Sequence, residues 1–198
     1  MKRTLLFLSI IGISGCASNK YLQPMPNTPS AQLRLVTVPS NNNSVSGGTN
    51  YECTDEGEVK EGAQIDYIAK LGFKVNLLRS LSRIGMPAYN EDIADSHQNE
   101  VYIPANQKFH LQFQGVGISG FTPGVSNVND GLLYSWCTKL ISFFPKENAN
   151  YEALYDYVEL PNGDETCGVK LFEIVEKEQY IYSKVEVENY QVSENYCQ

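Results

Sequence analysis

The chain has two histidines, His97 and His110, as its only candidate imidazole bases. A serine hydrolase needs such a base beside a hydroxyl nucleophile, with an acid to orient the ring. Ser119, in the stretch Gly-Ile-Ser-Gly, is one residue short of the G-x-S-x-G turn that presents this nucleophile in many hydrolases. His110 falls on the polar side of an expected strand, without an acidic partner that the sequence identifies. The pattern favours a protein that is not an enzyme, and a hydrolase using His97 or His110 is the alternative.

A second motif, GVGISG at residues 115–120, has the G-x-G-x-x-G spacing of dinucleotide-binding loops. That interpretation requires a helix to begin at the motif, so that its amino end meets the pyrophosphate. Residues 121–124 read Phe-Thr-Pro-Gly instead, which is typical of a loop. We therefore interpret 115–120 as a hairpin loop, and we expect no cofactor.

Carboxylates and one imidazole gather between Asn90 and Glu100, a composition that Ca²⁺ can use. Their order does not follow an EF-hand loop, and the glycine that such a loop needs for its turn is missing. We interpret this stretch as a solvated acidic loop and expect no metal site.

Residues 65–84 carry apolar side chains near helical spacing, and Gly85 and Pro87 follow as helix-ending residues. The sequence therefore predicts a helix over 65–84. Four basic residues fall on it in a chain with an acidic excess: Lys70, Lys74, Arg79 and Arg83. They form a candidate partner-binding face, and a solvated helix face is the plainer alternative.

The chain has five cysteines, and no two of them are spaced as C-x-x-C. The usual signature of thioredoxin-like redox sites and of zinc ribbons is therefore missing. Four cysteines fall in the expected domain, and in an oxidising compartment an even number predicts two disulfides. The favoured pairing is Cys137–Cys167 with Cys53–Cys197, and the rival pairing is Cys53–Cys137 with Cys167–Cys197.

The fifth cysteine, Cys16, ends an amino-terminal pattern typical of a secretory signal. Lys2 and Arg3 precede a short apolar stretch, Leu5–Ile13, and a bilayer span would need about 20 apolar residues. The stretch Ile13-Ser14-Gly15-Cys16 resembles the lipobox of bacterial lipoprotein precursors. This resemblance implies cleavage before Cys16, a diacylglyceryl thioether on its sulfur and an acylated amino group.

The lipobox also implies where the protein works. Residues 1–15 leave as a signal peptide, and the acyl chains on Cys16 hold the rest at a membrane, since two or more chains give stable attachment. Ala17 stands where many inner-membrane lipoproteins have aspartate, which implies outer-membrane sorting in a host with two membranes. The proline-rich stretch 16–31 reads as a lipidated tether.

Cleavage would also remove Lys2 and Arg3 and take the formal net charge from −8 to −10. Nucleic-acid-binding proteins need a basic surface, so the composition argues against a nucleic-acid partner.

Most of the remaining chain reads as strands separated by Pro, Gly and Asn turns. Phe109, Leu111 and Phe113 alternate with polar residues, which is typical of a half-buried strand. Tyrosines at 151, 155 and 157 share one face of another strand, and we favour sheet packing over a binding face for them. The expected strands are 32–38, 101–103, 109–114, 132–144, 151–160, 167–175 and 180–188, and 41–50 reads as a loop.

Residues 32–198 are thus expected to form one disulfide-containing antiparallel β-sandwich, transthyretin-like or immunoglobulin-like, with one short helix. In size, anchor and strand content the chain looks like several sandwich lipoproteins, including the transthyretin-like lipoproteins that anchor type VI secretion machines. We expect a lipid-anchored envelope protein that binds or assembles with an envelope partner. A lipid-anchored periplasmic or surface hydrolase is the alternative.

Overall fold

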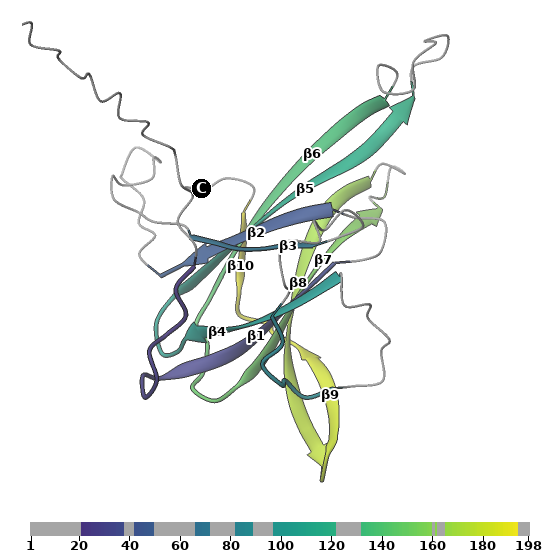
Figure 1. The fold of residues 1–198 in the computed structure, drawn as a ribbon. Coiled ribbons are helices and arrows are strands. Elements are labelled where there is room, and N and C mark those ends of the chain that lie inside the picture. The colour runs from purple at the N-terminus through teal and green to yellow at the C-terminus, as the bar shows by residue number, and fades with distance from the viewer. Residues whose placement is uncertain are drawn as a thin grey trace, which may run out of the picture.

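A computed structural model describes residues 21–37, 42–49, 66–71, 82–88, 97–121, 132–159, 161 and 165–193. These residues form strands and connecting turns (Figure 1). The strands are β1 (Ser30–Thr37), β2 (Asn42–Gly48), β3 (Asp66–Leu71), β4 (Gln98–Pro104), β5 (Phe109–Phe121), β6 (Leu132–Phe143), β7 (Asn150–Glu159), β8 (Glu165–Glu178), β9 (Ile181–Glu186) and β10 (Gln191–Ser193).

The strands build two five-stranded sheets, in the orders β4-β1-β7-β8-β9 and β10-β6-β5-β2-β3. Every pairing is antiparallel except that of β1 with β7, which is parallel. The predicted mainly antiparallel β-sandwich is confirmed.

The core between the sheets follows from the alternation read in the sequence. Phe109, Leu111 and Phe113 on β5 are fully buried, and the first two lie opposite Phe143 and Ile141 of β6 in the strand register. Since strand side chains alternate between faces, the same register turns the polar residues between them outward. Burying each large apolar side chain contributes about 1.5–3 kcal/mol.

Tyr155 of β7 shows why part of the glycine-rich stretch is needed. Its ring stacks on Phe113, with the ring centroids 5.8 Å apart. A Cβ on Gly115 would collide with the Tyr155 hydroxyl. Residues 115–120 continue strand β5, so their interpretation as a hairpin loop is wrong. Glycine here admits a tyrosine from the opposite sheet, as glycine in strand interiors often does.

The disulfide Cys137–Cys167 joins β6 to β8, one strand from each sheet, with Cα atoms 6.0 Å apart. This half of the favoured pairing is confirmed, and the rival pairing is wrong because it used both cysteines differently. Closing a loop of this length is worth about 3–4 kcal/mol in the chain-entropy model. Cys53 and Cys197 lie outside the described residues.

The predicted helix over 65–84 is wrong where the structure describes it, because residues 66–71 form strand β3 and 82–84 are irregular. Pairing with β2 buries the apolar side chains of Ala69 and Leu71. A strand can bury these residues as well as a helix can. The backbone N–H groups of Ser82 and Ile84 donate to side chains on β4. These tertiary hydrogen bonds replace the internal ones that a helix would make.

The predicted loop at 41–50 is also wrong, because β2 occupies most of it. Its serines, asparagines and glycines are usual turn residues. Pairing on both sides, with β3 and β5, overrides this composition.

Candidate functional site

Strand β6 ends at Phe143, and this residue and the next, Phe144, face opposite environments. Phe143 is buried and packs edge-on against Tyr151, with ring centroids 5.2 Å apart. Phe144 is 66% exposed. Because side chains alternate along a strand, the inward Phe143 turns its neighbour outward. Phe144 comes directly after the last residue of β6 and before Pro145, so it stands at the end of the sandwich.

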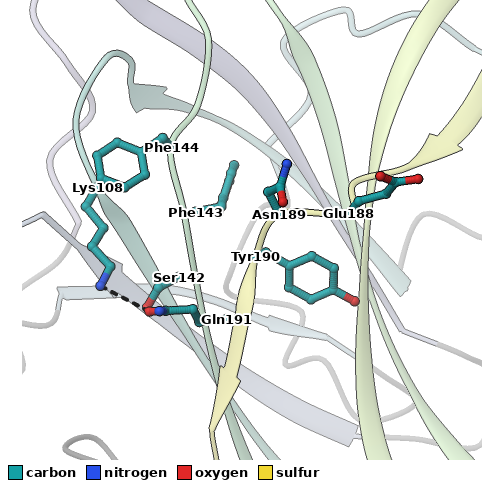
Figure 2. Close-up of a pocket in the computed structure, with 8 residues that line it drawn as sticks. All are labelled: Lys108, Ser142, Phe143, Phe144, Glu188, Asn189, Tyr190 and Gln191. Carbon is teal, nitrogen blue, oxygen red and sulfur yellow. Dashed lines mark hydrogen bonds between the residues drawn. The ribbon is translucent and has the colours of Figure 1, made fainter.

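Two hollows of about 390 and 380 Å³ lie beside Phe144, and its side chain lines both. Figure 2 shows the first hollow, where Phe143 and Phe144 lie near Asn189 and Tyr190 of the crossover from β9 to β10. We call Phe144 and these two hollows the Phe144 face. Exposed apolar side chains with small hollows at one end of a domain are typical of a binding surface.

The crossover that closes the Phe144 face is held by the opposite sheet. The backbone N–H of Val187 donates to the carbonyl of Leu171, at 2.9 Å. The Tyr190 hydroxyl donates to the carbonyl of Val169, at 3.3 Å. Burial is the main cause that raises the pKa of Tyr190, so its hydroxyl stays protonated at neutral pH and can donate this hydrogen bond. These two hydrogen bonds thereby hold the wall of the hollows in place.

Two lysines border the Phe144 face. Lys108 donates to the side chain of Gln191 at 3.3 Å, as the dashed line in Figure 2 marks. Lys146 lies 2.8 Å from a carboxylate oxygen of Glu173, and this hydrogen bond raises the pKa of Lys146. Glu186 and Glu188, which line the second hollow, add negative charge.

The β8–β9 hairpin extends beyond the rest of the sandwich (Figure 1). Val185 lies opposite Glu173, and Glu173 lies opposite Tyr151, so Val185 continues the inner face of the sheet. Val185 is 49% and Ile181 is 55% exposed, and Val185 lines the second hollow with Phe144. The hairpin therefore extends the apolar surface of the Phe144 face.

A buried serine–histidine pair lies on the outer face of the β5–β6 ladder. Ser142 Oγ is 2.7 Å from His110 Nδ1, and the two residues are register partners. Burial, with a smaller contribution from Lys108, lowers the pKa of His110 to about 4, so the ring is neutral at pH 7. Ser142 also lines the first hollow. A neutral imidazole on a hydroxyl is chemically able to accept its proton.

The histidines do not meet the serine that the sequence suggested. Ser119 lies on the same strand as His110, nine positions further on. At about 3.3 Å per residue, the two positions are roughly 30 Å apart. His97 is buried just before β4, in the other sheet. Asp95, an aspartate two residues before His97 that could serve as an acid partner, lies outside the described residues.

Charged side chains are buried on the outer face of the β4-β1-β7 sheet. Arg34 donates two hydrogen bonds to Glu100 Oε1, at 3.0 and 3.1 Å. Glu100 Oε2 accepts from three successive backbone N–H groups, those of residues 84–86. Gly85 has φ 82°, in the left-handed region, which lets these groups converge on one oxygen. Burial alone would raise the pKa of Glu100, but these hydrogen bonds lower it.

The same cluster continues across the sheet. The Glu152 carboxylate is fully buried between Arg34, at 3.7 Å, and Lys184, at 3.3 Å. Lys184 also lies over the Phe172 ring, 5.1 Å from its centroid. This cluster ties β1, β7 and β9 together and fixes the segment 82–88.

The structure describes only two of the four residues of the candidate partner-binding face, Lys70 and Arg83. Lys74 and Arg79 lie outside the described residues, and Lys70 is on β3 rather than on a helix. Arg83 lies 3.7 Å from Glu100, at the edge of the buried cluster. Cys16, the lipidation candidate, also lies outside the described residues. The face formed by the four basic residues stays a prediction, because two of its members lie outside the described residues.

Sequence reasoning missed Phe144 because residues 132–144 read as one buried strand. The signal was present, since two adjacent residues of a strand cannot both face the core and Pro145 ends the strand. The tyrosines at 151 and 155 are buried in the core, so their assignment to sheet packing is confirmed.

Within the described ranges, histidine, cysteine and carboxylate side chains form no group of three that could hold a metal ion. In the same ranges, no helix has the length and apolar character required to cross a bilayer. Comparison with known proteins supplies no family, because no family model matches the chain and no curated protein matches it either.

Proposed function

We propose that this chain is a lipid-anchored envelope protein that acts by binding or assembling with another envelope protein through the Phe144 face. The single observation that carries the proposal is the apolar surface at one end of the sandwich, where Phe144 and Val185 line the same hollow while 66% and 49% exposed. Apolar groups in contact with water gain free energy when a partner covers them.

The lipobox at Cys16 supports the anchor. Tyr21 is buried against Phe109, and its backbone N–H donates to Tyr67, so the chain is attached to the sandwich from that residue onward. Five residues of extended chain span at most about 18 Å. A lipid on Cys16 would therefore hold the sandwich close to the membrane, a shorter reach than the predicted tether 16–31 allows.

Site-specific photocrosslinking tests the proposal. A photoreactive phenylalanine analogue replaces Phe144 in one variant. In a control variant it replaces Tyr102, which is 37% exposed on β4, an edge strand of the opposite sheet. We expect residue 144 to crosslink reproducibly to one envelope protein in intact cells, and residue 102 not to. Equal crosslinking from both positions, or none from 144, would contradict the proposal.

The anchor is tested separately. Cells that make the protein are fed a radiolabelled fatty acid, and the wild-type chain is compared with Cys16→Ser. We expect label and membrane association in the wild type and neither in the variant. Equal labelling of both chains would rule out lipidation at Cys16.

A hydrolase remains a second candidate, and the hydrogen bond between Ser142 and His110 favours it. Ser142 would be the nucleophile and His110 its base, with substrate entering the first hollow. An activity-based fluorophosphonate probe tests this directly. Labelling of the wild type that is lost in Ser142→Ala would support it, whereas an unlabelled wild type would oppose it.

A further inference from the structure

The four edges of the two sheets are protected to different degrees. The edge of β4 is covered, because the backbone N–H of Glu100 donates to the carbonyl of Ser82 and that of Tyr102 donates to the side chain of Gln23. Tyr21 bonds to the carbonyl of Tyr67 on β3. Strand β10 is only three residues long. Strand β9 has six residues, and no segment within the described ranges pairs with its outer side.

The register shows which backbone groups point away from the sheet. Val187 donates to the carbonyl of Leu171, so residues 187, 185 and 183 form the hydrogen-bonded pairs with β8. Hydrogen-bonded and non-bonded positions alternate in an antiparallel ladder. The N–H and C=O groups of Tyr182 and Glu186 therefore point outward from the edge.

Edge strands usually carry a lysine or a proline that blocks further pairing. Strand β9 has no proline, and its only lysine, Lys184, is turned onto the outer face of the sheet. There it lies 3.3 Å from Glu152 and over the ring of Phe172. Because Lys184 makes these intramolecular contacts, its side chain does not block strand pairing at the β9 edge.

The side chains around this edge define the chemistry of a partner. Val185 and Ile181 present an exposed apolar row on the inner face. Acidic residues exceed basic ones between 176 and 188, with Lys177 and Lys184 set against Glu176, Glu178, Glu186 and Glu188. An added strand is therefore best matched by aliphatic side chains on one face and basic side chains among them.

We infer that β9 accepts an extended peptide segment of an envelope protein, with alternating aliphatic and basic side chains, as an added strand. This inference rests on the proposed binding function and specifies its partner. Main-chain hydrogen bonds to Tyr182 and Glu186 would supply affinity, while the apolar row and the glutamates would supply selectivity. Pairing of β9 with β9 of a second copy is disfavoured, because it would bring two acidic edges together.

A synthetic peptide is the probe: acetylated and amidated Val-Lys-Val-Lys-Val-Lys-Val, added to the purified full-length protein in detergent. Two controls are the same peptide with glutamate in place of lysine, and a lysine peptide N-methylated at every residue, which leaves no N–H on either edge. We expect saturating lysine peptide to slow amide exchange of Tyr182 and Glu186 about tenfold, and the controls to leave it unchanged.

Two variants sharpen the test. Glu186→Pro removes an outward N–H while leaving the β8 ladder intact, so it should abolish binding with an unchanged unfolding midpoint. Glu186→Gln should weaken peptide binding several-fold. Leu22→Lys makes the same charge change at an 82% exposed position next to Gln23, which bonds to β4 at the opposite edge of the sheet, and should not weaken it. Protection spread over other strands, or equal binding by Glu186→Pro, would overturn the inference.

A dimer of the peptide-free protein in sedimentation, with β9 protected, would identify a second copy as the occupant and overturn the inference. A crosslink from residue 144 that persists in Glu186→Pro cells would overturn strand addition and leave the proposed binding function standing.

Discussion

Two regions of the sandwich differ in what they bury: one buries charged side chains, and the other exposes apolar side chains. On the outer face beside β1, Arg34, Glu100 and Glu152 are charged and almost fully buried. At the end of β6 and on β9, Phe144 and Val185 are apolar and about half exposed or more. The buried charges are satisfied by one another and by backbone groups of the segment 82–88. Removing one member of the first region would leave an uncompensated buried charge. The second region is the apolar surface through which we propose that a partner binds.

The strongest expected effect is on the buried cluster. Replacing Arg34 by methionine keeps the volume but leaves Glu100 and Glu152 buried without their shared cation. We expect the free energy of unfolding to fall by about 3–5 kcal/mol, measured by urea denaturation. Gln32→Met, on the same face of β1 but less buried, is the control. A loss below ~1 kcal/mol would show that the cluster is not a stabilising unit.

Substitutions of the two adjacent phenylalanines compare the stability contributed by a buried and by an exposed side chain in the second region. Phe143→Ala should cost about 3–5 kcal/mol, because it leaves a cavity beside Tyr151 and Phe109. Phe144→Ala should change stability by less than ~0.5 kcal/mol, since its side chain is exposed. Thermal or urea unfolding measures both. Equal losses would mean that Phe144 is a core residue.

The pH dependence of stability tests the buried pair next to the Phe144 face. The folded pKa of His110, about 4, lies below its ordinary value of 6.5. The stability that this ring provides is therefore present above pH 6.5 and is lost as the pH falls toward 4, by up to about 3 kcal/mol. Urea denaturation at pH 7 and pH 4 measures the loss. His110→Gln should show a smaller difference between the two values, and an unchanged difference would contradict the assignment.

The smallest expected effect on stability belongs to the hairpin. Val185→Ser should leave the unfolding midpoint nearly unchanged, within ~0.5 kcal/mol, because the side chain is about half exposed. Its buried counterpart in the same sheet, Leu171→Ser, should be strongly destabilising. If both variants are equally stable, Leu171 and Val185 do not differ as a core residue and an exposed residue of the same sheet.

The alternation of apolar residues was enough to predict the sandwich and most of its strands, because period two survives into the structure at Phe109, Leu111 and Phe113. Residues 66–71 were misread as helix because a short apolar run fits either period. Only the pairing with β2, which is distant in sequence, selects the strand conformation for these residues. Glycines at 115–120 were misread as a loop because a single sequence does not show that Tyr155 packs against Gly115.

The candidate site was harder to predict than the fold. Pro145 marks the end of β6 in the sequence, but the Phe144 face also depends on how the β9–β10 crossover returns, which no local pattern encodes. The serine that meets His110 is Ser142, not Ser119, because cross-strand register rather than sequence proximity places it. The buried charges also required three strands to be brought together before their partners could be known.

The most direct test of the Phe144 face compares capture of the envelope partner by three tagged chains after crosslinking in intact cells. These are the wild type, the double variant Phe144→Ser with Val185→Ser, and the control Val158→Ser, which is 37% exposed on β7. The account predicts that one partner is recovered with the wild type and the control and lost with the double variant, while all three chains unfold at the same midpoint. Recovery of the same partner by the double variant would contradict it.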